Sequence, residues 1–280
     1  MGKSIIAKIE EFILKHTKPK YMDSKSKVED FLSKNPKRNP FINKFFKSID
    51  FNGMQVFTFG DEKSENTILY VHGGAFINEI NYQHLLYCRK LARKLKAFVF
   101  APVYPLAPHH KAMETFDAIT ELYGCLLDNR TNITLMGDSA GGGFVLSFCQ
   151  YLNLIGLSQP EHVIAISPWV DISMSNPPYD NENDPILGEI GLKEIGKSWA
   201  GDLDTDDYKV SPIFGDDVDF ADALIFAGTN EIFYKDIEKY VEKLENVRFI
   251  TGQGMFHIYP LFPSPEARKA FKEIKKEILD

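Results

Sequence analysis

A glycine-rich turn within residues 131–148, TNITLMGDSAGGGFVLSF, constrains the fold more than any other stretch of this chain. The apolar run before Gly137 is typical of a strand, and the apolar segment after the turn is long enough for a helix. Ser139 lies at the turn in the pattern Gly-x-Ser-x-Gly. Glycines are needed there because a sharp turn strains the serine backbone and bulky neighbours would clash. The pattern predicts a nucleophilic serine at a helix N-terminus, where free N–H groups face an anion. The alternative is a serine that only caps the helix.

Segments typical of strands and helices alternate along most of the chain. Predicted strands cover residues 54–59, 67–71, 97–101, 133–136, 162–167, 223–227 and 247–250, and predicted helices cover 82–94, 113–127, 142–154, 235–244 and 266–279. This alternation predicts an α/β fold in which helices cover both faces of a mostly parallel sheet.

Two segments depart from the alternation and suggest how the chain is divided. Residues 1–50 begin with a helical pattern and continue as a polar stretch that contains prolines. The main domain, residues 51–280, is interrupted at about 172–220 by a stretch rich in Asp, Asn and Pro, with one helical piece at 191–200. Because long insertions in compact domains are often functional, we expect both segments to form a cap over the strand ends. Its apolar side chains, expected to bury part of a substrate, include Phe41, Phe45, Phe46 and Trp199.

The helix predicted at residues 3–16 places its apolar residues on one side. Our main interpretation is that this helix packs against the protein's own domain. The alternative is a lid, or a helix that touches a membrane.

Composition limits the partners and the compartment. The formal net charge of −7, without a basic cluster, argues against nucleic acid. No apolar run approaches the length of a membrane span, so stable membrane insertion is not expected. Charged residues interrupt any signal-peptide core near the N-terminus, which predicts a cytoplasmic protein. Cys88, Cys125 and Cys149 are odd in number and widely spaced, so we expect buried, reduced thiols and neither a disulfide nor a metal site.

A nucleophilic serine needs backbone donors for the oxyanion that forms during acyl transfer. The predicted strand at 67–71 is followed by His72-Gly73-Gly74-Ala75-Phe76. Small consecutive residues allow N–H groups to converge on one point, so Gly73, Gly74 and Ala75 are predicted oxyanion donors. The N–H of Ala140, next to Ser139, is the fourth predicted donor.

The serine also needs a base and an acid that orients the base. His257 lies in a glycine-containing loop after the last predicted strand and is the predicted base. Glu231, which follows the strand at 223–227, is the predicted acid because the chain order is then Ser, acid, His. Asp171, after the preceding strand, is the alternative acid. Asp138, inside the turn, should point away from the base and is predicted to be structural.

The ordered motifs HGGAF, APVYPLAPHH, GDSAGG, SPWVD and GMFH resemble the hormone-sensitive-lipase-like branch of the α/β-hydrolases. The resemblance extends from about residue 56 to the C-terminus. It implies an eight-stranded sheet, a helical cap formed by the N-terminus and a later insertion, and a catalytic role for Ser139 and His257. The sequence departs from the family pattern at two positions. Ala75 takes the place of the last glycine in the usual motif HGGG, and Glu231 stands where Asp is common.

We therefore expect a serine carboxylesterase that hydrolyses short- to medium-chain acyl esters through Ser139, His257 and Glu231, with no metal or organic cofactor. Its expected partner is a small ester, and a homodimer is left open. Two alternatives remain. One is a peptidase or amidase that uses the same residues, and the other is a non-catalytic receptor of the same fold.

Overall fold

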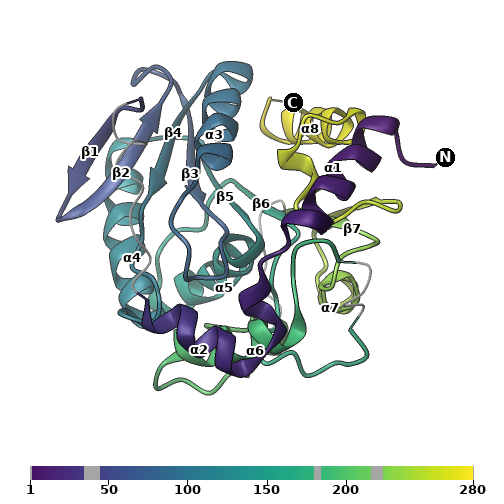
Figure 1. Cartoon of the computed structure of the whole chain (residues 1–280). Helices are drawn as coiled ribbons and strands as arrows, with labels where there is room; N and C mark the ends of the chain where they lie inside the picture. Colours follow the sequence, from purple (N-terminus) through teal and green to yellow (C-terminus); the bar gives the residue numbers. More distant parts are fainter. Residues whose placement is uncertain (1, 35–44, 180–183, 216–222, 280) are drawn as a thin grey trace.

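The computed structural model of the chain describes residues 2–34, 45–179, 184–215 and 223–279 (Figure 1). Within these residues one sheet of eight strands has the order β1-β2-β4-β3-β5-β6-β7-β8. The first two strands pair in antiparallel fashion and the other six run parallel. The strands are β1 (Ser48–Phe51), β2 (Met54–Phe59), β3 (Asn66–Val71), β4 (Ala97–Pro102), β5 (Ile133–Asp138), β6 (His162–Ile166), β7 (Ala223–Gly228) and β8 (Val247–Gly252).

Helices cover both faces of the sheet, as predicted. They are α1 (Ile5–Thr17), α2 (Lys25–Ser33), α3 (Tyr82–Leu95), α4 (Ala112–Asn129), α5 (Ser139–Ile155), α6 (Glu189–Ala200), α7 (Tyr234–Val241) and α8 (Pro265–Leu279), with short 3₁₀ turns η1 (Lys20–Asp23), η3 (Pro212–Phe214) and η4 (Tyr259–Leu261).

Each face of the sheet has its own apolar core. In β3, Leu69 and Val71 belong to the core shared with α4 and α5, whereas Ile68 and Tyr70 belong to the core shared with α3 and α8. Successive side chains point to opposite faces of a strand, and both faces here are covered by helices. The central strands therefore read in the sequence as continuous apolar runs.

The turn at Ser139 is tighter than the sequence pattern predicted. Strand β5 continues to Asp138 and α5 begins at Ser139, three residues before the predicted helix. The helix enters so close to the sheet that a Cβ atom on Gly141 would lie 2.0 Å from the carbonyl oxygen of Val71. A Cβ atom on Gly143 would lie 2.1 Å from the carbonyl oxygen of Trp169. These glycines carry no hydrophobic signal, so the periodicity located the helix start too late.

The sheet also has a strand that the sequence did not indicate. β1 pairs with β2 in the register Ile49 to Val56, and its four residues are exposed or half-buried. The sequence does not indicate β1 because a short, exposed edge strand lacks a strong apolar pattern.

The N-terminal helix forms as predicted and packs against α8 of its own domain, but most of its apolar side is exposed. Ile5, Ile9, Phe12 and Ile13 are exposed by 54–76%, and the small residue Ala7 on the opposite side is fully buried. The apolar side of α1 therefore faces away from the protein. Figure 1 shows α1 beside α8, apart from α2 and α6.

The three cysteines lie on helices and are unpaired, as expected. Cys88 and Cys149 are buried, and burial raises the pKa of both thiols. The prediction was wrong for Cys125, which is exposed because it lies on the outer face of α4. In the described ranges, no helix is long and apolar enough to cross a membrane.

Replacement of Gly143 by alanine should lower the free energy of unfolding by about 1–3 kcal/mol, because the new methyl group would overlap the Trp169 carbonyl. Gly124→Ala is the matched control, since Gly124 is also in a helix and nothing lies within 4 Å of an added Cβ. That change should raise stability by about 0.5–1 kcal/mol. Urea unfolding of both variants measures the difference. If both substitutions changed the free energy of unfolding equally, the close approach between Gly143 and the Trp169 carbonyl would be refuted.

Candidate active site

Ser139 lies where β5 meets α5, at the carboxyl edge of the parallel strands. Its φ angle is +52°, in the left-handed region that non-glycine residues rarely adopt, and its side chain is buried. The glycine on the strand side, Gly137, could not carry a Cβ atom, which would lie 2.4 Å from the Gly141 carbonyl oxygen. The flanking glycines thus permit the strained turn that presents the hydroxyl.

His257 reaches Ser139 from the loop after β8. Its Nε2 atom lies 2.9 Å from Ser139 Oγ, within hydrogen-bonding distance. The loop is joined to the loop after β7, because Gly254 N–H donates to Thr229 Oγ1 and Asn230 N–H donates to the Met255 carbonyl. These backbone contacts fix the position of the imidazole relative to the serine.

Glu231 lies on the other side of the imidazole. Its Oε2 atom accepts hydrogen bonds from Ser167 Oγ at 2.7 Å and from Gly228 N–H at 3.1 Å. The same oxygen is 3.8 Å from His257 Nδ1, close enough for an ion pair but too far for a hydrogen bond. Among the described residues, neither Glu231 Oε1 nor His257 Nδ1 has a hydrogen-bond partner.

Two opposing influences set the pKa of His257. Burial is the largest and disfavours the charged imidazolium. The carboxylates of Glu231, Asp184 and Asp138 together outweigh burial and raise the pKa of His257 above its ordinary value. The protonated form of His257 is therefore stabilised within this site.

Asp171, the alternative acid, does not lie beside His257. Both of its oxygens accept hydrogen bonds from the backbone and hydroxyl groups of Ser173 and Ser175. This buried carboxylate closes a turn at the start of the insertion. Of the two candidate acids, the structure brings only Glu231 to the imidazole.

Three of the four predicted oxyanion donors remain available. The N–H groups of Gly74, Ala75 and Ala140 make no hydrogen bond to any other residue in the described part of the chain. Gly74 and Ala75 both have positive φ, of 118° and 53°, so the loop backbone turns sharply at these residues. The prediction for Gly73 needs correction, because its N–H already donates to Asp138 Oδ1 at 3.0 Å.

Asp138 has the structural role that the sequence predicted. Its Oδ1 atom also accepts a hydrogen bond from the Tyr70 hydroxyl at 2.6 Å, and Oδ2 is 3.3 Å from His84 Nε2. Burial would raise the pKa of Asp138, but His84, Tyr70 and the Gly73 N–H outweigh it and lower that pKa. Through these contacts the buried carboxylate connects the oxyanion loop to the nucleophile turn.

A cavity of about 150 Å³ brings these groups together. Ser139, His257, Gly74 and Ala75 line it on the side of the sheet. Apolar residues from two distant parts of the chain also line it: Pro19, Tyr21 and Met22 precede the sheet, and Ile186 and Leu187 belong to the later insertion. The two parts are in contact, because η1 and α2 both pack on α6.

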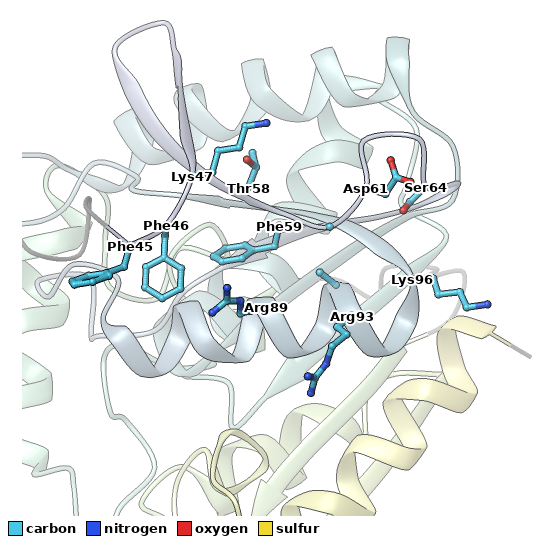
Figure 2. A pocket seen from close by; sticks show the side chains of 12 residues that line it. Phe45, Phe46, Lys47, Thr58, Phe59, Asp61, Ser64, Arg89, Arg93 and Lys96 are labelled. Carbon is cyan, nitrogen blue, oxygen red and sulfur yellow. The ribbon is translucent and has the colours of Figure 1, made fainter.

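The aromatic residues expected in this wall lie elsewhere. Phe45 and Phe46 line a separate cavity of about 680 Å³ between β2 and α3, where Figure 2 shows Phe46 and Phe59 near Arg89. Trp199 stacks on Phe76 at 3.5 Å between ring centroids and does not line the catalytic cavity. Phe41 lies outside the described residues. Apolar composition identified the segments but not which side chains face the site.

Two residues near the site were not predicted from the sequence. Ser167 donates to Glu231 Oε2 and accepts a hydrogen bond from Ile258 N–H at 3.0 Å, so it joins the acid to the loop of the base. Its place directly after β6, at the carboxyl edge, was the available signal. Asp184, in the insertion, accepts from Ile232 N–H at 2.9 Å, next to Glu231. Nothing in the local sequence of Asp184 indicates this contact.

Comparison with known proteins identifies the class to which this fold and site belong. A family model for the alpha/beta hydrolase fold matches residues 68–261. The chain belongs to the α/β-hydrolase family, and the resemblance found in the motifs is confirmed.

The relatives are enzymes of this family. An esterase from Acinetobacter venetianus is 29% identical over 219 residues, which are 74% of this chain and 72% of the relative. Hormone-sensitive lipase from Mus musculus is 28% identical over 148 residues, which are 50% of this chain and 20% of that protein. A crystal structure of a candidate esterase from Staphylococcus aureus superimposes with a TM-score of 0.85 at 28% identity and covers 92% of this chain and 94% of that chain.

Removal of the Ser167 hydroxyl tests the contact between the acid and the base loop. We expect Ser167→Ala to lower kcat about tenfold with little change in KM, because Glu231 loses a hydrogen bond worth about 1.5–3 kcal/mol. Ser147→Ala is the control. Ser147 is equally buried, but its hydroxyl has no hydrogen-bond partner among the described residues. Steady-state kinetics on p-nitrophenyl acetate measures both, and a full-activity Ser167→Ala enzyme would contradict the expectation.

Proposed function

We propose that the chain is a serine carboxylesterase that hydrolyses short- to medium-chain acyl esters through Ser139, His257 and Glu231. Hydrolysis of carboxylic esters agrees with its membership of the α/β-hydrolase family and with a relative that is named an esterase. The observation that carries the proposal is the 2.9 Å contact between His257 Nε2 and Ser139 Oγ, in a cavity that also holds unoccupied backbone donors.

The chemistry begins at the serine hydroxyl. Ser139 Oγ attacks the ester carbonyl carbon while His257 Nε2 takes the hydroxyl proton. The carbonyl oxygen becomes an oxyanion, to which the N–H groups of Gly74, Ala75 and Ala140 donate hydrogen bonds. Each such donor typically stabilises the transition state by about 3 kcal/mol. His257 then returns its proton to the departing alcohol, which leaves an acyl group on Ser139.

Water completes the cycle. His257 takes a proton from a water molecule that attacks the acyl carbon, a second oxyanion forms in the same place, and the free acid leaves Ser139 with its proton restored. Glu231 supports both steps, because its carboxylate stabilises the imidazolium that each step creates. The 3.8 Å separation is within ion-pair distance, and such contacts often shorten in the reacting complex.

We further propose that residues 1–50 and about 172–220 form the cap, with the remainder of 51–280 as the catalytic domain. In support, residues of both segments wall the cavity opposite Ser139, and Lys18 Nζ donates to the Asp184 carbonyl at 2.9 Å. The cavity volume of about 150 Å³ is below the 300–1,000 Å³ usual for drug-sized ligands. A cavity of this volume with apolar lining residues favours acyl chains of roughly C2 to C8.

The nucleophile can be identified by covalent labelling. A fluorophosphonate should form a single adduct on the peptide that contains Ser139, because only an activated serine hydroxyl attacks the phosphorus. Intact-protein and peptide mass spectrometry measure the site. Ser139→Ala should abolish both labelling and hydrolysis of p-nitrophenyl acetate. A second labelled serine, or activity that survives the substitution, would refute the assignment.

The acid can be identified by a pair of isosteric substitutions. Glu231→Gln should lower kcat by about 10²–10⁴-fold, because the imidazolium loses its charged partner. Asp171→Asn is the matched control and should change kcat little, because the carboxylate of Asp171 accepts its hydrogen bonds from Ser173 and Ser175 in its own turn. Single-turnover kinetics of both variants separates acylation from product release. The reverse ranking would assign the acid to Asp171.

A series of p-nitrophenyl esters tests the substrate range. From acetate to palmitate, kcat/KM should be highest between C2 and C8 and should fall for longer chains, because the cavity has no room for them. Leu187→Ala should shift the optimum of kcat/KM to longer acyl chains, because a smaller side chain in the lining enlarges the cavity. A wild-type optimum at laurate or beyond would rule out the closed, small-substrate site.

A further inference from the structure

The outer face of α1 is an apolar surface without a partner among the described residues. Ile5, Ile6, Ile9, Phe12 and Ile13 are exposed by 43–76%. Their spacing of one, three and four residues places them on one side of a helix. Contiguous exposed apolar patches on a soluble fold usually mark an interaction site. The patch defined by these five residues is referred to below as the α1 apolar face.

The structure holds this face outward. At the start of the helix, Ser4 donates from both its N–H and its hydroxyl to the carboxylate of Glu266 on α8, at 2.7 and 2.8 Å. Beyond its end, Lys18 Nζ donates to the Asp184 carbonyl. The helix rests on the protein through Ala7, and both flanks are tied to other elements. Rotation that would bury the α1 apolar face would break these contacts.

The charges around the face are basic. Residues 2–20 contain five lysines and two glutamates, although the whole chain has a formal net charge of −7. Exposed Lys8 and Lys15 lie on α1 within one turn of Ile9 and Phe12, and Lys15 also forms an ion pair with Glu11 at 3.5 Å. Apolar residues on one side with lysines along the border are the features of helices that lie in a lipid–water interface. They complement an anionic lipid surface in particular.

The size of the face favours a lipid surface over a second copy of the chain. Stable dimers bury about 800 Å² and 20–30 residues on each partner. The α1 apolar face offers five side chains along a helix of 13 residues, about 20 Å in length. Adsorption to a bilayer requires no matching partner surface, because a few apolar side chains enter the boundary between head groups and acyl chains.

We propose that α1 is a peripheral docking helix that binds reversibly to anionic lipid surfaces. The helix lies parallel to the surface, with the α1 apolar face in the head-group boundary and its lysines near the lipid phosphates. This role goes beyond the proposed esterase activity. It also positions the catalytic cavity near the surface, because the residues that follow α1, Pro19, Tyr21 and Met22, line that cavity.

The test is binding of the full-length chain to vesicles. Sedimentation should show binding to phosphatidylcholine vesicles that contain about 30% phosphatidylglycerol and weaker binding without it, with loss as salt is raised. The double variant Ile9→Ser, Phe12→Ser should reduce the partition coefficient at least tenfold, because it removes two apolar groups from the boundary. Leu154→Ser is the matched control, since Leu154 is 67% exposed on α5 and far from α1 in sequence.

Hydrolysis of soluble p-nitrophenyl acetate verifies that both variants fold. Absence of wild-type binding, or equal binding by the double variant, would overturn the proposal. So would a stable dimer in analytical ultracentrifugation that the double variant converts to monomers, since a second copy would then occupy the face. Ser139→Ala should bind vesicles like the wild type. Failure of docking and failure of the esterase assignment therefore give different results.

Discussion

The site depends on a close backbone approach between α5 and the sheet. The helix begins one residue after β5 ends, and its first turn lies against the carbonyls of Val71 and Trp169 at distances that exclude a Cβ atom at Gly141 and Gly143. This approach places the Ser139 hydroxyl and the Ala140 N–H at the same edge as the oxyanion loop. Any side chain at either glycine would separate the helix from the strands and the nucleophile from its donors.

A buried carboxylate secures this approach from the side of the sheet. Asp138 receives hydrogen bonds from Tyr70 in β3 and from Gly73 in the oxyanion loop. Because an unpaired buried carboxylate is costly, these partners must be in place whenever the protein is folded. The residue next to the nucleophile therefore holds the oxyanion loop in register. The contact also explains why the Gly73 N–H is engaged, whereas the N–H groups of Gly74 and Ala75 make no hydrogen bond among the described residues.

The proposed cap is connected to the proposed catalytic groups through a second carboxylate. Asp184 lies in the insertion, receives a hydrogen bond from Ile232 beside Glu231, and accepts through its carbonyl from Lys18. Residues that line the substrate wall are thus linked to the loop of the acid. The same lysine ends the segment that carries the α1 apolar face. Two hydrogen bonds of Asp184 therefore connect the end of α1, the insertion and the loop after β7.

The sequence by itself determined the fold class and the identity of Ser139, His257 and Glu231 as the candidate residues, because alternation and chain order depend on local patterns. It also indicated the two segments that wall the cavity. Only the tertiary structure decided between Glu231 and Asp171 as the neighbour of His257, since that depends on how loops from different strands meet. The tertiary structure also decided three further features. These are the hydrogen bond from Gly73 to Asp138, the hydrogen bonds by which Ser167 joins Glu231 to Ile258, and the outward orientation of the apolar side of α1. Hydrophobic periodicity shows that a helix has an apolar side, but which way that side points follows from contacts such as Ser4 with Glu266, which are distant in the sequence.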